Sequence, residues 1–72
     1  MDAWKSLEAL ICEYTEGQRR IDVAIAYNRA RAAAEPNRRR RYDLYCQRIQ
    51  LEDMRADLAY SIDQMRRCID GK

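Results

Sequence analysis

The chain has 72 residues, with 14 Lys and Arg against 12 Asp and Glu, a net charge of +2, and no His. Apolar residues make up 47% of the chain and there are only two Gly and one Pro, which excludes a disordered chain and a β fold with many turns. Because His is the commonest acid–base catalyst and the commonest metal ligand, we expect no catalytic residue, no metal site and no cofactor.

No stretch of the sequence approaches the roughly 18 apolar residues that span a membrane, and Met1–Trp4 does not begin like a signal peptide. The three cysteines, Cys12, Cys46 and Cys68, are odd in number and lack the spacing of a zinc site. Cysteines of this kind are typical of small apolar side chains in a reducing compartment. We therefore expect a cytoplasmic protein that does not contact a membrane.

One turn divides the chain. Residues 34–37 contain the only Pro, which is disfavoured inside a helix but suits the first turn of a new one. The segments on either side are rich in Ala, Leu, Arg, Glu and Gln, and this predicts helices over 2–34 and 37–69. Because the connection is short, we expect an all-α antiparallel hairpin that forms a single domain over residues 1–72.

Several residues mark the ends and the middle of these predicted helices. Asp2 is expected to cap the first helix, and Gly71 is expected to end the second. Gly17 lies inside the first helix, where it costs about 1 kcal/mol relative to Ala. A kink or a close approach of another chain would suit a glycine here, but the apolar spacing continues across Gly17, so we expect the first helix to be continuous. Trp4 is expected to pack against Ile69 at the open end of the hairpin.

Apolar residues recur on one side of each predicted helix when residues are placed at 100° intervals. The expected register pairs apolar residues of the two helices: Leu10 with Ile62, Tyr14 with Leu58, and Ile21 with Leu51. The predicted hairpin core has ten members: Leu7, Leu10, Ile11, Tyr14, Ile21, Ile25, Leu51, Leu58, Ile62 and Met65. The same stripe of the second helix also includes Leu44, Met54 and Ile69.

Each predicted helix is also apolar on the side opposite this core. The second stripes consist of Cys12, Val23, Tyr27, Ala30 and Ala34, and of Tyr42, Tyr45, Cys46, Ile49, Ala56 and Tyr60. A lone hairpin buries only one side of each helix, and a single core below about 70–80 residues supplies only a few kcal/mol. We therefore expect self-association into a helical bundle or symmetric oligomer, the alternative being a surface for a different protein.

The positive charge is concentrated near the turn. Residues 28–43 carry six Arg against Glu35 and Asp43, a net charge of +4, whereas residues 1–16 carry one Lys against four acidic residues, a net charge of −3. Arg38–Arg41 lie in the first turns of the second helix, where the helix dipole also favours anions. Successive residues point about 100° apart, so a phosphate pocket would need arginines from two subunits.

Two sets of candidate binding residues follow. The phosphate-binding candidates are Arg31, Arg38, Arg39, Arg40 and Arg41, for which a solvated tip and an acidic protein surface remain open as alternatives. The candidates for an interface or for stacking on bases are Tyr27, Tyr42, Tyr45, Ile49 and Tyr60.

The acidic residues of the second helix do not predict an enzyme. Glu52, Asp53 and Asp57 lie near one another, but they are interleaved with Arg48 and Arg55. At spacings of three and four residues, Glu52 and Asp53 are expected to form ion pairs with these arginines rather than to act as acid and base.

Two short patterns carry a resemblance to a known family. The first is Met-x-x-Asp-Leu-x-Tyr-x-Ile at residues 54–62, and the second is Tyr-x-x-Gly-x-Arg at residues 14–19. Together they resemble the N-terminal helical region of short sigma-factor-like regulators of Firmicutes phages and prophages. This implies a phage or mobile-element origin, a bacterial host cytoplasm, and an anti-defence or takeover role. In that family a DNA-reading helix-turn-helix follows, whereas this sequence ends at Lys72, so its DNA recognition is not expected here.

Three functions are compatible with these residues. The one we favour is a non-enzymatic helical oligomer that binds a host protein and inhibits or regulates it. The alternative is an oligomer that sequesters a nucleotide or cyclic dinucleotide, with Arg on phosphate and Tyr on the bases. The third is weak, salt-sensitive nucleic-acid binding by the basic tip.

Overall fold

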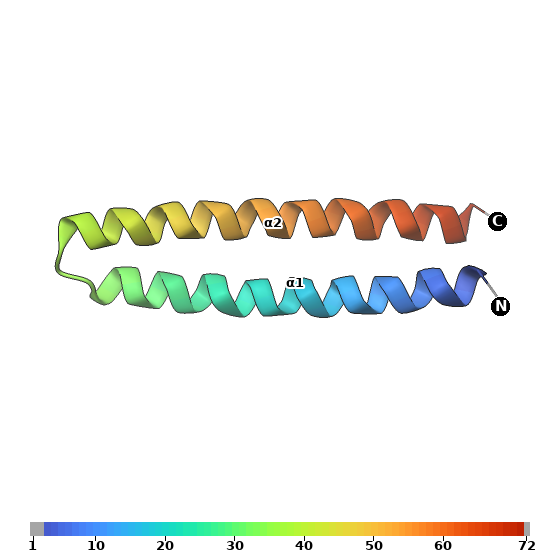
Figure 1. The fold of residues 1–72 in the computed structure, drawn as a ribbon, viewed down its shortest axis with the longest axis horizontal. Helices are drawn as coiled ribbons and strands as arrows, with labels where there is room; N and C mark the ends of the chain where they lie inside the picture. Colours follow the sequence, from blue (N-terminus) through green and yellow to red (C-terminus); the bar gives the residue numbers. More distant parts are fainter. Residues whose placement is uncertain (1–2, 72) are drawn as a thin grey trace.

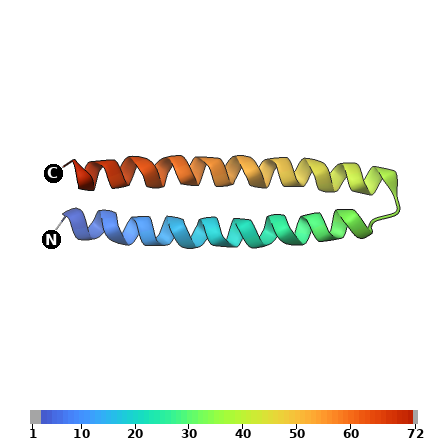
Figure 2. The same ribbon diagram turned by 180° about the vertical axis from the view of Figure 1, so that it is seen from behind.

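Two helices lie side by side and run in opposite directions, joined by residues 35–37 (Figure 1). A computed structural model describes residues 3–71 of the chain, and their side chains from residue 6 onward. α1 spans Ala3–Ala34 and α2 spans Arg38–Asp70. The backbone measures 54 × 14 × 14 Å, and the free ends of both helices lie together, away from the turn (Figure 2). The predicted all-α antiparallel hairpin is confirmed.

The turn is held by side chains that bond to the backbone. Asn37 has an extended conformation, and its Oδ1 accepts hydrogen bonds from the backbone N–H groups of Arg39 (2.9 Å) and Arg40 (3.1 Å). Glu35 Oε1 in turn accepts a hydrogen bond from the backbone N–H of Asn37 (3.2 Å). Asn37 is therefore the N-cap of α2, so the helix begins one residue later than the sequence predicts.

The other helix ends agree with the prediction to within a residue where they can be compared. Gly71 ends α2, and its backbone N–H donates to the carbonyl oxygens of Arg67 and Ile69. Its φ of −68° is right-handed, so the cap does not depend on the freedom of glycine. Asp2, the predicted cap of α1, lies outside the described residues, as does the side chain of Trp4.

The helices meet along a seam whose positions alternate between spacings of four and three residues. We call these positions the seam: Leu7, Ile11, Tyr14, Gln18, Ile21, Ile25, Asn28 and Ala32 of α1, and Leu44, Arg48, Leu51, Arg55, Leu58, Ile62, Met65 and Ile69 of α2. This spacing is that of a coiled coil. The buried residues of the described chain all lie on it: Ile21, Ile25, Asn28, Leu44 and Ile62. Most other seam residues are half-buried. The core is therefore thin, as expected for one pair of helices.

One predicted core residue, Leu10, and one residue of the predicted apolar stripe, Met54, lie outside the core. Leu10 is 37% exposed and Met54 is 52% exposed. Each stands one position before a seam residue, Ile11 and Arg55 respectively, and the 100° rotation per residue turns it onto the flank of the hairpin. The prediction placed both on a stripe that was too wide for a single helix–helix contact.

α1 runs without a break through Gly17, as the single predicted helix over 2–34 requires. A Cβ atom added to Gly17 would lie 3.6 Å from Cδ1 of Leu58, which is ordinary van der Waals distance. The close neighbour of Gly17 is thus α2 of the same chain. The prediction paired Leu58 with Tyr14, about one turn away. Side chains in a helix lean toward its N-terminus, so Leu58 reaches toward the turn and meets Gly17.

Candidate binding surfaces

One candidate surface runs along the outer side of α1. Val23 lies two residues from each of the buried Ile21 and Ile25, so it points away from the seam, and it is 66% exposed. Residues on this side recur at spacings of four and three, and all are exposed. We call them the α1 edge: Glu16, Arg20, Val23, Tyr27, Ala30 and Ala34.

A second candidate surface runs along the outer side of α2. Tyr60 lies two residues from each of Leu58 and Ile62, and it is 67% exposed. The positions on this side follow the same alternating spacing, and all are exposed except the half-buried Cys46. We call them the α2 edge: Tyr42, Cys46, Ile49, Asp53, Ala56 and Tyr60.

The two edges do not form one patch. The two helices lie side by side (Figure 1). Each edge lies on the far side of its helix from the seam, so the α1 edge and the α2 edge face in opposite directions across the hairpin. Four of the five predicted interface residues belong to these edges: Tyr27, Tyr42, Ile49 and Tyr60. A partner that covers one edge therefore leaves the other free.

The fifth predicted interface residue, Tyr45, lies beside the α2 edge. Its ring centroid is 6.5 Å from that of Tyr42, and the guanidinium of Arg48 lies 5.4 Å from the centre of its ring. The pKa of Tyr42 is raised, chiefly by side-chain hydrogen bonding with Cys46. Tyr42 is therefore a neutral, partly apolar side chain at ordinary pH.

The basic tip is the turn end of the hairpin, which carries Arg38–Arg41. It does not form a preorganised anion site. Arg38–Arg41 are exposed and turn successively around the first turns of α2, and none forms an ion pair with another described residue. The helix N–H groups on which the prediction relied are largely occupied, because Asn37 accepts bonds from those of Arg39 and Arg40, and its carbonyl accepts one from Arg41. A phosphate here would meet the guanidinium groups and few free backbone donors.

Arg31 and Arg40 do come together across the turn. They line an open hollow of about 220 Å³, but Glu35 and Asp43 line the same hollow. Arg31 also lies over the ring of Tyr27, with its guanidinium carbon 5.8 Å from the ring centre. The nearby carboxylates make this hollow electrostatically mixed, which does not favour an anion over a cation.

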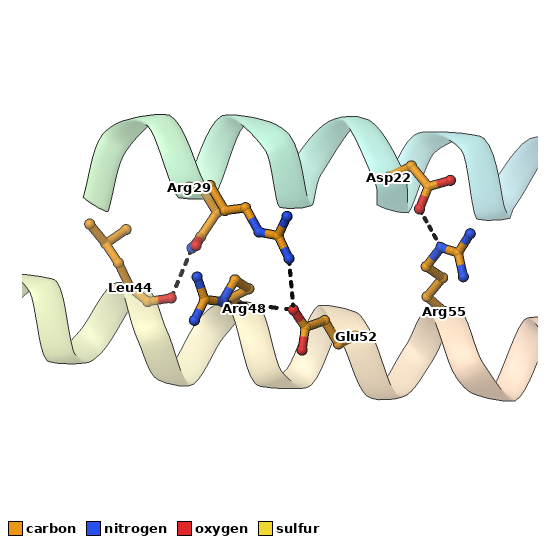
Figure 3. Close-up of polar contacts among 7 residues, drawn as sticks. Asp22, Arg29, Leu44, Arg48, Glu52 and Arg55 are labelled. Carbon is orange, nitrogen blue, oxygen red and sulfur yellow. Dashed lines mark hydrogen bonds and ion pairs between the residues drawn. The ribbon is translucent and has the colours of Figure 1, made fainter. Parts of the chain in front are cut away.

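One face of the hairpin carries ion pairs that join the helices (Figure 3). Arg55 pairs with Asp22, and Glu52 receives both Arg29 (3.6 Å) and Arg48 (3.7 Å). The predicted pair of Arg48 with Glu52 is confirmed. Arg55 bonds across to α1 instead of pairing within α2 as predicted, since its seam position directs it toward the other helix. Asp53 forms no ion pair within the described residues.

Asn28 is a residue that the sequence analysis missed. It is 5% exposed, and its Nδ2 donates a hydrogen bond to the backbone oxygen of Leu44 (2.9 Å). Its Oδ1 is buried and has no partner among the residues that the structure describes. The signal was present, because Asn28 follows Ile21 and Ile25 at spacings of four and three, but only apolar residues were counted into the stripe.

The cysteines and a second hollow are the other features of the described residues. All three cysteines are free, with Cys12 and Cys68 exposed. Over the described residues, no group of three or more acidic, Cys or His side chains could hold a metal ion, and neither helix is long and apolar enough to cross a membrane. A second open hollow of about 260 Å³ is lined by both helices, with Gln18 on α1 and Arg66 on α2.

Comparison with known proteins adds no family. No protein-family model, no curated protein and no solved structure matches the chain. The resemblance to phage regulators therefore stays a prediction. Any function has to be argued from the two edges and the basic tip.

Proposed function

We propose that this protein is a non-enzymatic, self-associating binding protein whose two edges pack against helices of protein partners. The main observation behind this proposal is that more large apolar side chains are exposed than apolar side chains are buried. Among residues 6–71, eight large apolar side chains are exposed, whereas four apolar side chains are buried. Such an excess of exposed apolar side chains favours a protein whose surface is covered by another protein chain when it functions.

Regulation is the activity that such a surface supports. A rod with two apolar edges can occupy a helical surface of another protein and block it, with no need for a catalytic group. In this proposal the partner is a host protein, in keeping with the phage or mobile-element origin that the resemblance implies. The free cysteines support placing this activity in a reducing cytoplasm.

Native mass spectrometry of the protein purified from cells tests the proposal. We expect a multiple of the 8.6 kDa chain, or a complex with another protein. Val23→Asp and Tyr60→Asp, one on each edge, should shift the protein toward monomer while circular dichroism stays helical. Gln47→Asp, at an exposed position that points away from both edges, serves as the matched control. A bare monomer for the unaltered chain at every concentration would contradict the proposal.

A second candidate is capture of a phosphorylated small molecule by the tip. Arg38–Arg41 are four consecutive exposed arginines, and none of them forms an ion pair within the described chain. Tyr42 follows them directly. The same spectrum would then carry an added mass of several hundred daltons, which Arg39→Ala and Arg40→Ala should abolish. Retention of that mass by these variants would remove the tip from consideration.

A further inference from the structure

The two edges carry complementary side chains at matching levels along the rod. The hydrogen bond from Asn28 to the backbone of Leu44 shows which residues of α1 and α2 lie at one level. Counting outward from there at about 1.5 Å per residue puts Val23 at the level of Ile49, and Ala30 at the level of Tyr42. Matching levels in one chain become contacts when a second copy lies alongside in the same direction.

We infer that the α1 edge of one copy packs against the α2 edge of a second copy, with both hairpins pointing the same way. The inference rests on the proposed function, in which the edges are binding surfaces, and it names their occupant. Val23 would pack on Ile49 of the second copy, and the small Ala30 would accept the ring of Tyr42. These contacts join large side chains to small or apolar ones, as a coiled-coil seam requires.

Charge complementarity supports this occupant. Arg20 lies on the α1 edge and Asp53 lies on the α2 edge, within one residue of the same level. Both are exposed, and neither forms an ion pair within the described part of the chain. In the inferred contact each would meet an opposite charge beside an apolar cluster, where charge pairs specify register and partner.

Two α1 edges that meet end for end fit worse. The apolar members of the α1 edge, from Val23 to Ala34, lie in the half next to the turn, while Glu16 lies in the other half. If two α1 edges met in opposite directions with their ends aligned, Tyr27 and Ala30 would face the acidic half of the second copy. In the same-direction contact Val23 and Ala30 lie on Ile49 and Tyr42, so apolar residues meet apolar residues.

The contact joins two different surfaces, so it is head-to-tail. Each pair of copies keeps one α1 edge and one α2 edge free, so further copies add, in a ring where the rotation between copies closes and in an open array where it does not. This arrangement explains why both edges are apolar, which a single twofold dimer through one edge does not.

A charge swap tests the pairing by sedimentation velocity over a range of protein concentrations. Arg20→Asp and Asp53→Arg should each weaken self-association by about tenfold or more, because like charges would then meet at the contact. The double variant, which carries both substitutions, should recover. An equimolar mixture of the two single variants should also recover, since Asp at position 20 then meets Arg at position 53. Gln47→Arg, at an exposed position that points away from the α2 edge, is the control and should associate like the unaltered chain.

The outcomes separate the inference from the proposed function. Absence of association in the unaltered chain would overturn both. If Arg20→Asp leaves association unchanged, or if the mixture fails to recover, the head-to-tail pairing is overturned. The edges then remain binding surfaces for another partner. Weakening by Asp53→Arg alone would indicate that two α2 edges meet instead.

Discussion

Asn28 donates a hydrogen bond from its Nδ2 to the backbone oxygen of Leu44, and this bond crosses the seam at its most buried part. The other polar atom of the amide, Oδ1, has no partner among the described residues. A buried amide that is only half satisfied costs stability, but a single polar residue in a coiled-coil seam can fix register and orientation. Asn28 thus ties the two helices together at one level.

Asn28→Leu is expected to raise the free energy of unfolding by about 1 kcal/mol, because it removes the unpaired Oδ1 and adds apolar contact. It should also loosen the register, which would be seen as more than one set of amide signals in an NMR spectrum. Gln18→Leu, at a half-buried seam position that forms no hydrogen bond with described residues, should raise stability without this heterogeneity. A single, unchanged set of signals in Asn28→Leu would show that the hydrogen bond does not select the register.

Gly17→Ala should raise the free energy of unfolding by about 0.5–1 kcal/mol, because Ala is the better helix former and its Cβ meets Leu58 without a clash. In a chain of this size that corresponds to a rise of several degrees in Tm. Ala26→Gly, at an exposed position of the same helix, should produce a loss of similar size. A lower Tm in Gly17→Ala would mean that something approaches Gly17 more closely than α2 does.

The sequence predicted the helices, the turn and the antiparallel packing because these depend on local propensity and on one breaker. It was less successful with the seam. Leu10 and Met54 are apolar and lie near the stripe, yet whether they are covered depends on the second helix, which hydropathy alone does not place. Asn28 was missed for the converse reason, since a polar residue at a seam position gains its partner only when Leu44 lies opposite.

The tip shows the same limit. The run of arginines predicted an anion site from charge and from free helix N–H groups. The cap by Asn37 consumes those donors, and capping depends on a side-chain geometry that charge counting does not include.

Removal of this cap has a predictable cost. Asn37→Ala should lower the free energy of unfolding by about 1 kcal/mol, because the N–H groups of Arg39 and Arg40 lose their acceptor. Asn37→Asp retains the acceptor and adds a negative charge at the helix N-terminus, so it should match or exceed the unaltered chain. Urea unfolding followed by circular dichroism measures both. Equal stability of the Ala and Asp variants would show that the cap contributes nothing.

The ion pair of Asp22 with Arg55 joins the helices, but both side chains are nearly half exposed, at 49% and 45%. A double-mutant cycle with Asp22→Asn and Arg55→Gln should therefore give a coupling energy of about 0.5 kcal/mol, which falls as salt is added. The pair of Asp63 with Arg67, within α2 and more exposed, provides a reference at or below this value. A coupling of several kcal/mol would indicate a pair far better shielded from water than these exposures allow.

The charge at the ends of the rod should control self-association if copies pack in the same direction. Every tip then lies beside the tip of the next copy, and each carries the +4 charge of residues 28–43. Arg39→Gln combined with Arg40→Gln should strengthen association by about a few-fold at low salt, because it reduces this repulsion, and the gain should shrink as salt screens it. Arg66→Gln combined with Arg67→Gln makes the same change in charge at the acidic end and should weaken association. Sedimentation velocity at two salt concentrations measures both. If the tip substitutions weakened association instead, basic tips would have to face acidic ends, and the copies would run in opposite directions.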